Sequence, residues 1–527
     1  MKKLPLAIET FAEIRENNYL YIDKTEQILR MVQSAKANFL SRPGRFGKSL
    51  LLDTMQQLFE GNQALFEGLY IANKWDWLTK YPVIKLDFSS GSISNREELD
   101  RRMHQLLANN QQRLGLEFVP CEDSINYFEQ LIRETHHHYQ QKVVVLLDEY
   151  DRNILDNLNT PKSANGILSG LKGLYSVLKA QDAHIHFIFM TGITKSTKVK
   201  LFSGINQLVD ISLDQRFSDI CGFTQVELET QMAEHLSGVD WQQLRDWYGG
   251  YQFLGTEIFN PYAVMLFAAK DKQYRSYWFE TGRPSFLLRL LQRHRYFLPD
   301  FEQLEVSDDI LDSFDVEHIN PVTLMFQKGY LALDKVYTDE LGEQSYKLKI
   351  PNRDVRSALG NQLIAGYASI EEESKTLRQN LYRALSNGDL PALKHELIYI
   401  FDLIPWRSYK LQIIEEFKGF YTSVAYAFFS NINATVIPES TRNRVQIDMT
   451  VMLGDYIYVM EFKRDERKEF TPFEPNPALV QLKEKAYGEK YRHSGKTVFY
   501  VGLIFNSHER RLVQMDWEPL EPSPSLS

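Results

Sequence analysis

Three residues near the C-terminal end have the types and spacing of a metal-dependent hydrolytic site. Asp448 lies in the run VQIDMTVML, and Glu461 and Lys463 lie in the next run, YIYVMEFKR. Side chains two apart in a strand point to the same face, so Glu461 and Lys463 project together. If the two runs pair as a hairpin, Asp448 reaches the same edge. Two carboxylates there would hold Mg²⁺, which activates water, while Lys463 orients that water and offsets charge.

A fourth candidate for this site lies in the segment that follows the two runs. ALVQLKEKAYGEKYR reads as a charged helix, and Gln481 within it would contact a metal-bound water or a phosphate. The pattern D-x(12)-E-x-K is common by chance, but a helix before it, a hairpin within it and a helix after it make it more specific. We therefore predict Asp448, Glu461, Lys463 and Gln481 as catalytic residues, with Asp448 and Glu461 as the metal ligands.

A second constellation has the end of a phosphate-binding loop. The stretch FLSRPGRFGKSLLLDTM contains Gly47-Lys48-Ser49, but Arg42 stands where G-x-x-x-x-G-K-[ST] has its first glycine. Such a loop wraps backbone N–H groups around phosphates at a helix N-terminus; the lysine reaches the outer phosphates and the hydroxyl holds Mg²⁺. ANFLS fits the preceding strand and KSLLLDTMQQLF the following amphipathic helix. We therefore expect nucleotide to be bound by Gly44, Gly47, Lys48 and Ser49. The Ser49 hydroxyl would also hold the Mg²⁺ ion.

Two later apolar runs end in polar residues suited to the same nucleotide. VVVLLDEYD ends in Asp148-Glu149, where the aspartate would hold Mg²⁺ through its water shell and the glutamate would polarise an attacking water. FIFMTGITK places Thr191 and Thr194 where hydroxyls would lie beside the γ-phosphate. Each feature alone is also typical of a solvated or capped strand end. The three features in this order predict a P-loop NTPase core, with Glu149 catalytic and Asp148 a metal ligand.

The elements that must position these residues form an α/β pattern in three blocks. In residues 1–215, short apolar strands alternate with helical segments, and unbroken runs such as VVVLL suit parallel strands buried on both faces. Residues 216–404 read as mostly helical. Within them, PVTLMFQKGYLALDKV followed by QSYKLKIPN reads as a helix and a hairpin, which is either a winged-helix-like element or a cover for a helical core. Residues 405–520 read as helix, three strands, helix and strand.

The chain resembles a bacterial family that joins an AAA-ATPase-like domain to a PD-(D/E)XK nuclease-like domain of restriction-endonuclease-like fold. The resemblance implies that 1–215 is the ATPase core and 405–520 the nuclease-like domain. It also implies that the R-P-x-R-F-G-K-S loop is a family trait that still binds ATP, with Arg42 and Arg45 adding charge near the phosphates. The matching stretches are NNYLYIDKT, FLSRPGRFGKSLLLDTM, VVVLLDEYDRNIL, FIFMTGITKSTKVKLFSGINQLVDISLD, WYGGYQF, FNPYAVM, YWFETGRPSFL and QLKEKAYGEKY.

Two basic residues leave alternatives open. Relatives often read Y-E-G-Y-Y-A-S-V before the first nuclease-like strand, whereas this chain reads FKGFYTSV with Lys418 at the place of the glutamate. In nucleases of this fold that carboxylate helps to hold metal, so Lys418 is compatible with a one-metal enzyme or with a domain that binds without cutting. Arg216, in SLDQRFSDICGFT, would be either an arginine finger or part of a surface ion pair.

The overall composition of the chain limits which partners and which cellular compartment are expected. The 527 residues carry a net charge of −9, so nucleic-acid contact must come from a local patch rather than from overall charge. Two cysteines, Cys121 and Cys221, are too few for a disulfide framework and fit a reducing compartment. No apolar run approaches the roughly 20 residues that span a bilayer. We expect a cytoplasmic protein without membrane contact.

The expected function is that of an ATP-binding protein whose Mg²⁺-dependent nuclease domain cleaves nucleic acid, DNA before RNA, under nucleotide control. A homo-oligomer is compatible with the ATPase domain. The alternative is a nucleotide-switched module that binds nucleic acid or protein and does not cleave. A third hypothesis, ATP as a purely structural ligand, is disfavoured by Glu149.

Overall fold

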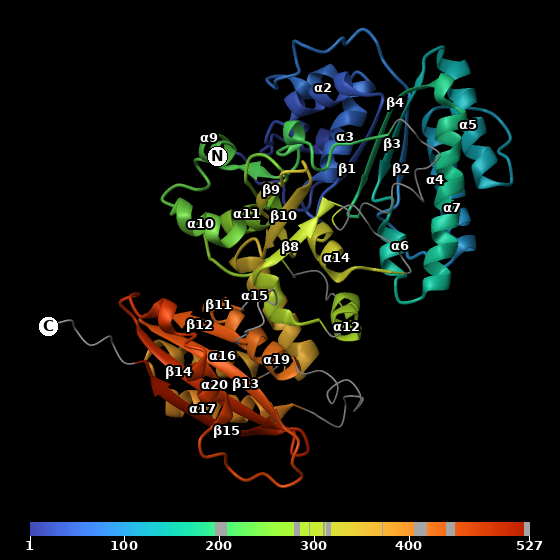
Figure 1. The fold of residues 1–527 in the computed structure, drawn as a ribbon. Helices are drawn as coiled ribbons and strands as arrows, with labels where there is room; N and C mark the ends of the chain where they lie inside the picture. The colour runs from blue at the N-terminus through green and yellow to red at the C-terminus, as the bar shows by residue number, and fades with distance from the viewer. Residues whose placement is uncertain are drawn as a thin grey trace. The chain divides into compact units, whose positions relative to one another are not determined.

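The structure, a computed structural model, divides the chain into two units. The first unit comprises Met1–Tyr277 with Val306–Tyr346, and the second comprises Trp278–Glu305 with Lys347–Ser527. The predicted middle region, 216–404, therefore contributes residues to both units, and its boundaries stay a prediction. Each unit is considered by itself below (Figure 1). The residues that the structure describes are 1–194, 208–278, 285–294, 296–308, 311, 318–370, 373–404, 419–438 and 448–520.

The first unit is built on a five-stranded parallel sheet with the order β2-β3-β4-β1-β5. All six side chains of its strand β3 are buried, as expected of a parallel strand with helices on both faces. Figure 1 shows α2 and α3 on one face, and α4, α5 and α7 on the other. The strands are β1 (Ala37–Ser41), β2 (Val83–Asp87), β3 (Val143–Asp148), β4 (Ile185–Gly192) and β5 (Val209–Asp210); the helices are α2 (Thr25–Ser34), α3 (Lys48–Phe59), α4 (Arg96–Arg113), α5 (Ser124–Tyr139) and α7 (Pro161–Ala180).

Strand register places the polar strand ends of this sheet side by side. Asp87 of β2 is paired with Asp148 of β3, and Leu147 is paired with Met190 of β4, so Asp148 and Thr191 are neighbours. This is the carboxyl edge of the sheet, where ligands bind in open α/β folds. The P-loop NTPase fold class expected from the sequence is confirmed in this respect.

Shorter elements complete the first unit. The predicted helix followed by a hairpin is confirmed as α14, β9 and β10. Its turn carries the carboxylates of Asp339, Glu340 and Glu343, which argues against contact with a phosphate backbone. The elements are α1 (Phe11–Glu16), α6 (Arg152–Asp156), β6 (Phe223–Thr224), α9 (Gln225–Gln231), α10 (Trp241–Tyr248), β7 (Ile258–Phe259), α11 (Pro261–Ala269), α14 (Pro321–Gln327), β9 (Ala332–Thr338) and β10 (Gln344–Lys349), the last of which continues into the second unit.

The second unit contains a five-stranded mixed sheet with the order β11-β12-β13-β14-β15. The predicted order of helix, three strands, helix and strand is confirmed, and β15 adds a further strand. Its elements are α12 (Ser285–Arg293), β8 (Leu304–Ser307, which continues into the first unit), α15 (Arg353–Leu363), α16 (Ser374–Ser386), α17 (Leu390–Leu403), α19 (Phe420–Ser430), β11 (Thr435–Ile437), β12 (Met449–Leu453), β13 (Tyr456–Asp465), α20 (Pro477–Glu484), β14 (Thr497–Asn506) and β15 (Arg511–Pro519).

A tight hairpin between β12 and β13 sets the position of the C-terminal carboxylates. Leu453 pairs with Tyr456 across the two-residue turn, and Gly454 has a φ of 57°, which favours glycine. Met449 pairs with Met460, so one further step of the antiparallel register sets Asp448 opposite Glu461. In the described part of the chain, no helix is long and apolar enough to cross a membrane.

Candidate active sites

The structure brings together the four residues predicted at the C-terminal site, which we call the carboxylate site: Asp448, Glu461, Lys463 and Gln481. Asp448 Oδ2 accepts a hydrogen bond from the backbone N–H of Phe462 at 2.7 Å. Gln481 Nε2 donates to Glu461 Oε1 at 2.7 Å. Lys463 lies near enough to favour the charged form of both carboxylates. The hairpin and α20 therefore converge on one set of polar side chains.

Burial makes both carboxyl groups weaker acids than usual. It raises the pKa of Asp448 to about 6, against the opposing effects of the Phe462 N–H and Lys463. Burial, and then the negative charge of Asp448, raise the pKa of Glu461 to about 8, although Lys463 and Gln481 oppose the rise. Two carboxylates held this close in a low-dielectric setting repel one another. The site is therefore short of positive charge when both groups are ionised.

One oxygen of this site has no hydrogen-bond partner among the residues that the structure describes. Glu461 is 7% exposed, and its Oε2 is buried without a hydrogen-bond partner within the described residues. A buried carboxylate oxygen left unsatisfied is costly and calls for a ligand. Hard carboxylate oxygens are the donors that Mg²⁺ and Mn²⁺ prefer. The residues present thus fit a divalent cation held by Asp448 and Glu461.

The remaining question is whether the helix that precedes the sheet supplies a further metal ligand. Over the described ranges, no group of three or more His, Cys, Asp or Glu side chains is arranged to hold a metal ion. Lys418, which stands at the place of the glutamate of relatives, lies outside the described residues, as do Glu415 and Glu416. The described part of the carboxylate site is thus a pair of carboxylates with one amide and one ammonium.

A pH-dependent stability is expected from these pKa values. Between about pH 5 and about pH 8 the folded metal-free protein holds more protons at Asp448 and Glu461 than the unfolded chain does. Its free energy of unfolding should therefore fall as pH rises, by roughly 2 kcal/mol after allowance for relaxation. Thermal unfolding in the presence of a chelator measures this fall. Glu461→Gln should flatten the profile, and an unchanged slope in that variant would contradict the assignment.

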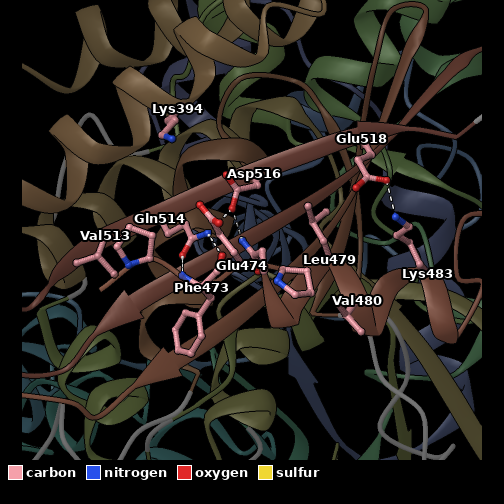
Figure 2. Close-up of a pocket in the computed structure, with 13 residues that line it drawn as sticks. Lys394, Phe473, Glu474, Leu479, Val480, Lys483, Val513, Gln514, Asp516 and Glu518 are labelled. Carbon is pink, nitrogen blue, oxygen red and sulfur yellow. Dashed lines mark hydrogen bonds and ion pairs between the residues drawn. The ribbon is translucent and has the colours of Figure 1, made fainter. Parts of the chain in front are cut away.

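A pocket of about 490 Å³ is lined by residues of α20, of β15 and of the segment that precedes α20 (Figure 2). At 3.6 residues per turn, Gln481 faces the carboxylate site while Leu479, Val480 and Lys483 face away from it. The pocket walls carry three carboxylates and two lysines, a balance that does not suit a polyanion. The pocket lining therefore does not suit a phosphate backbone. The lining residues are Lys394, Pro472, Phe473, Glu474, Pro475, Asn476, Leu479, Val480, Lys483, Val513, Gln514, Asp516 and Glu518.

In the first unit, the phosphate loop (residues 42–47) leads from β1 into α3. Gly47 precedes α3 with a φ of 92°, a conformation that side chains rarely adopt. Lys48 Nζ is buried and donates to the carbonyl oxygens of Arg42 at 3.0 Å and Pro43 at 3.1 Å. A Cβ added at Gly44 or Gly47 would meet no atom within 4 Å, so there is open space beside the loop backbone. These features fit a phosphate approached by backbone N–H groups.

Arg42, the residue in place of the first glycine, braces the loop from inside. Its side chain is fully buried, and its guanidinium donates to the carbonyl oxygens of Ser41 at 2.9 Å, Ser212 at 2.7 Å and Phe217 at 3.0 Å. The guanidinium also lies 3.9 Å from the ring centroid of Phe253. Burial lowers its pKa to about 10, which leaves it charged at neutral pH. This placement corrects the expectation of a phosphate contact, because the guanidinium is committed to backbone carbonyls.

Replacing Arg42 by the glycine of the usual motif should therefore lower the unfolding free energy of the first unit. In Arg42→Gly, three buried carbonyls lose their donors and a cavity opens beside Phe253, so we expect a loss of roughly 2–4 kcal/mol in unfolding free energy. Arg42→Lys should lose less, because an ammonium can still donate to some of the carbonyls. Differential scanning calorimetry of the ATPase transition measures the effect. An equal or higher transition temperature in Arg42→Gly would contradict the bracing role.

Two other arginines have protein partners. Arg45 Nη1 donates to the Tyr277 carbonyl at 3.2 Å, and its guanidinium lies 4.4 Å from the ring centroid of Tyr262. A phosphate contact would require Arg45 to leave these partners. Arg216 binds Asp214 through Nε at 3.0 Å, and its side chain is 61% exposed. Of the two alternatives for this residue, an arginine finger or a surface ion pair, the structure therefore shows the ion pair.

The predicted acidic strand end is assembled beside the loop. Asp148 Oδ1 accepts hydrogen bonds from the Thr191 hydroxyl and, at 3.0 Å, from the Glu149 N–H. Burial raises the pKa of Glu149, which Lys48 opposes, and Arg152 pairs with Glu149 at 3.1 Å. Ser49, half-buried in the first turn of α3, follows Lys48 directly. Lys48 and the acidic pair are thus electrostatic neighbours, as a nucleotide site requires.

Three carboxylates near this edge were missed in the sequence. Asp151 is buried and accepts from the Thr194 hydroxyl and N–H, both at 2.5 Å, so the Thr194 hydroxyl is held by protein. Asp87 lies at the end of β2, opposite Asp148. Like Asp148, it is an aspartate at the end of an apolar strand, so the same sequence pattern would have identified it. The third carboxylate is Glu9, whose pKa is raised by partial burial and by the charges of Asp148 and other carboxylates. No motif or spacing in the sequence pointed to Glu9.

Comparison with known proteins identifies both domains. A family model described as predicted AAA-ATPase matches residues 5–202, and a model of the PD-(D/E)XK nuclease superfamily matches residues 416–515. The chain is 40% identical over 516 residues, 97% of its length and 98% of the relative's, to a protein of Azotobacter chroococcum mcd 1 described as "Uncharacterized protein in vnfD 5'region". A crystal structure of Cdc6p from Pyrobaculum aerophilum is similar at 10% identity and a TM-score of 0.24, over 61% of this chain and 85% of that one, a similarity too low to support comparison. The chain belongs to the family that joins an AAA-ATPase-like domain to a PD-(D/E)XK nuclease superfamily domain.

Proposed function

We propose that this protein cleaves phosphodiester bonds of nucleic acid, DNA in preference to RNA, at the carboxylate site, and that ATP bound by the first unit controls the cleavage. The observation that carries the proposal is Glu461 Oε2, which is buried without a hydrogen-bond partner among the described residues. Gln481 donates a hydrogen bond to the other oxygen of the same carboxylate, and the charge of Lys463 favours its ionised form. A carboxylate kept in this costly state has a stability penalty that a bound cation relieves.

The residues of the carboxylate site have separable roles in this proposal. Asp448 and Glu461 hold the divalent cation, Mg²⁺ in the first instance, which supplies an activated water and charge neutralisation when bound. Lys463 places a positive charge beside the scissile phosphate and orients the attacking water. Gln481 fixes the Glu461 carboxylate through its 2.7 Å hydrogen bond and leaves Oε2 for the metal.

The nucleotide site of the first unit has a parallel set of proposed roles. Backbone N–H groups around Gly44 and Gly47 bind phosphates, and Lys48 leaves its two loop carbonyls to do the same. Ser49 and Asp148 hold Mg²⁺, and Glu149 polarises the attacking water. Thr191 orients Asp148, because its hydroxyl donates to that carboxylate.

A cleavage assay on the purified full chain tests the proposal. Linear and supercoiled DNA and single-stranded RNA would be offered with Mg²⁺ or Mn²⁺, with and without ATP, beside Asp448→Ala. Metal-dependent cutting that disappears in Asp448→Ala supports the nuclease. If no substrate is cut and calorimetry detects no metal binding, the nucleotide-switched binding module is supported instead, and Lys418→Glu becomes the informative reversion. Light scattering with and without ATP tests whether the protein forms a homo-oligomer.

A further inference from the structure

A residue of the phosphate loop is bonded to the point at which the chain leaves the first unit. Arg45 Nη1 donates to the carbonyl oxygen of Tyr277 at 3.2 Å, and the Arg45 guanidinium lies 4.4 Å from the ring centroid of Tyr262. Tyr277 is the last residue of the first segment of this unit, and Trp278 is the first residue of the second unit. The phosphate loop therefore holds one end of the peptide group through which the chain passes into the second unit.

The other end of the same peptide group is bonded within the second unit. The N–H of Trp278 donates to Asp354 Oδ1 at 3.1 Å. Asp354 is buried and lies in the first turn of α15. A trans peptide group is planar, and its C=O and N–H point in opposite directions. Hydrogen bonds at the two ends polarise each other, so loss of the bond at the Tyr277 carbonyl weakens the bond at the Trp278 N–H.

Within the second unit, α15 is fixed to a helix of the nuclease-like domain. Arg356, two residues after Asp354, pairs with both carboxylate oxygens of Glu302, through Nη2 at 3.1 Å and through Nη1. The hydroxyl of Tyr426 in α19 donates to the same carboxylate at 2.8 Å. Helix α19 belongs to the segment 416–515 that the nuclease model matches, and β11 follows it. The contacts of α15 therefore connect the Trp278 peptide group with the nuclease-like domain.

Arg45 is the side chain of the loop best placed to exchange partners. It is half-buried and has a φ of 67°, a conformation that residues other than glycine adopt at a cost, often at functional sites. The side chains of Arg42 and Phe46, by contrast, are buried. The Tyr277 carbonyl is a neutral acceptor, whereas nucleotide phosphates are anionic and match the fork of a guanidinium. A phosphate bound at the loop therefore competes with the Tyr277 carbonyl for Arg45.

We propose that Arg45 is the residue through which the nucleotide acts on the nuclease. When ATP occupies the phosphate loop, the Arg45 guanidinium leaves the Tyr277 carbonyl for the phosphates. The peptide group between Tyr277 and Trp278 then loses its bond to the loop, and the bond from Trp278 to Asp354 weakens. This inference rests on the proposed ATP site and adds the route by which that site controls cleavage.

Amide hydrogen exchange on the full chain, resolved to single residues, tests the proposal. In the parent, ATP with Mg²⁺ should make the Trp278 amide exchange about 10-fold faster, because its bond to Asp354 weakens. In Arg45→Met, the Trp278 amide should exchange at this faster rate whether ATP is present or absent. The matched control is Arg101→Met, which removes an arginine of α4 whose side chain is 77% exposed and should respond as the parent does.

The ATP affinity of the parent, measured beside the exchange, separates the two ways in which the expectation can fail. A parent that binds ATP without a change at Trp278 would overturn the role of Arg45 and leave the proposed nucleotide site standing. A parent that binds no ATP would refute the nucleotide site, and the role of Arg45 with it. The comparison in the parent needs no variant, so it decides the matter even if Arg45→Met does not fold.

Cleavage rates test the consequence for the nuclease. Arg45→Met should cut at one rate with and without ATP and lose less than about 10-fold in ATP affinity, since Lys48 and the loop backbone remain. Asp354→Ala should lose the response to ATP in the same way. Asp354→Asn keeps an acceptor for the Trp278 N–H and should retain the response. An Arg45→Met variant that binds ATP and responds to it as the parent does would overturn the proposal; if no substrate is cut, the exchange result decides.

Discussion

Glu461→Gln is expected to lower metal-dependent cleavage by about 10³-fold while leaving the fold intact. Glutamine keeps the shape of the side chain and can still interact with Gln481 at Oε1, but it removes the charge that a divalent cation needs. The variant should also stabilise the metal-free protein near pH 8, because an unsatisfied buried carboxylate, with a pKa of about 8, is gone. Activity and stability thus change in opposite directions, a result that a misfolded variant cannot give.

The measurement combines initial cleavage rates with Mn²⁺ titration by calorimetry. Glu466→Gln is the matched control, since Glu466 lies just beyond β13 with a side chain 75% exposed and 3.6 Å from Arg464. Its cleavage rate and metal affinity should equal those of the parent. Cleavage by Glu461→Gln at the parental rate would place the chemistry elsewhere and refute the carboxylate site as the nuclease centre.

The carboxylate site was predictable because its geometry is mostly local. A two-residue turn joins β12 to β13, so the strand period alone sets Glu461 and Lys463 on one face and Asp448 opposite them. Gln481 arrives on the helix that crosses from β13 to its parallel neighbour β14. The phosphate loop was predictable for the same reason, since a strand, a loop and a helix follow one another directly.

The parts that sequence reasoning missed depend on partners far away in the chain. Arg42 reads as a loop cation, yet its guanidinium donates to Ser212 and Phe217, whose carbonyls are positioned by tertiary structure. Asp151 carries no motif, and only folding of the first unit brings its carboxylate to Ile193 and Thr194. The division of the middle region between two units has the same origin, because contact rather than sequence order defines a unit.

Lys48→Ala tests the other half of the proposal and is expected to weaken ATP binding by about 100-fold. The lysine ammonium now donates to the Arg42 and Pro43 carbonyls, and Lys48 directly follows Gly47, where the loop backbone has open space beside it. Alanine removes the charge that would meet the outer phosphates. A fluorescent ATP analogue titrated with Mg²⁺ measures the affinity, with Lys172→Ala, an exposed position on α7, as the matched control.

The same variant separates nucleotide control from nuclease chemistry. Since Lys48 and the carboxylate site belong to different units, Lys48→Ala should leave the metal affinity of Asp448 and Glu461 unchanged. If ATP governs cleavage, the variant should cut at the nucleotide-free rate of the parent, whether ATP is present or absent. A variant that still responds to ATP as the parent does would refute control through the phosphate loop. If the parent itself cuts equally well with and without ATP, control is refuted and the carboxylate site remains a nuclease that acts independently of nucleotide.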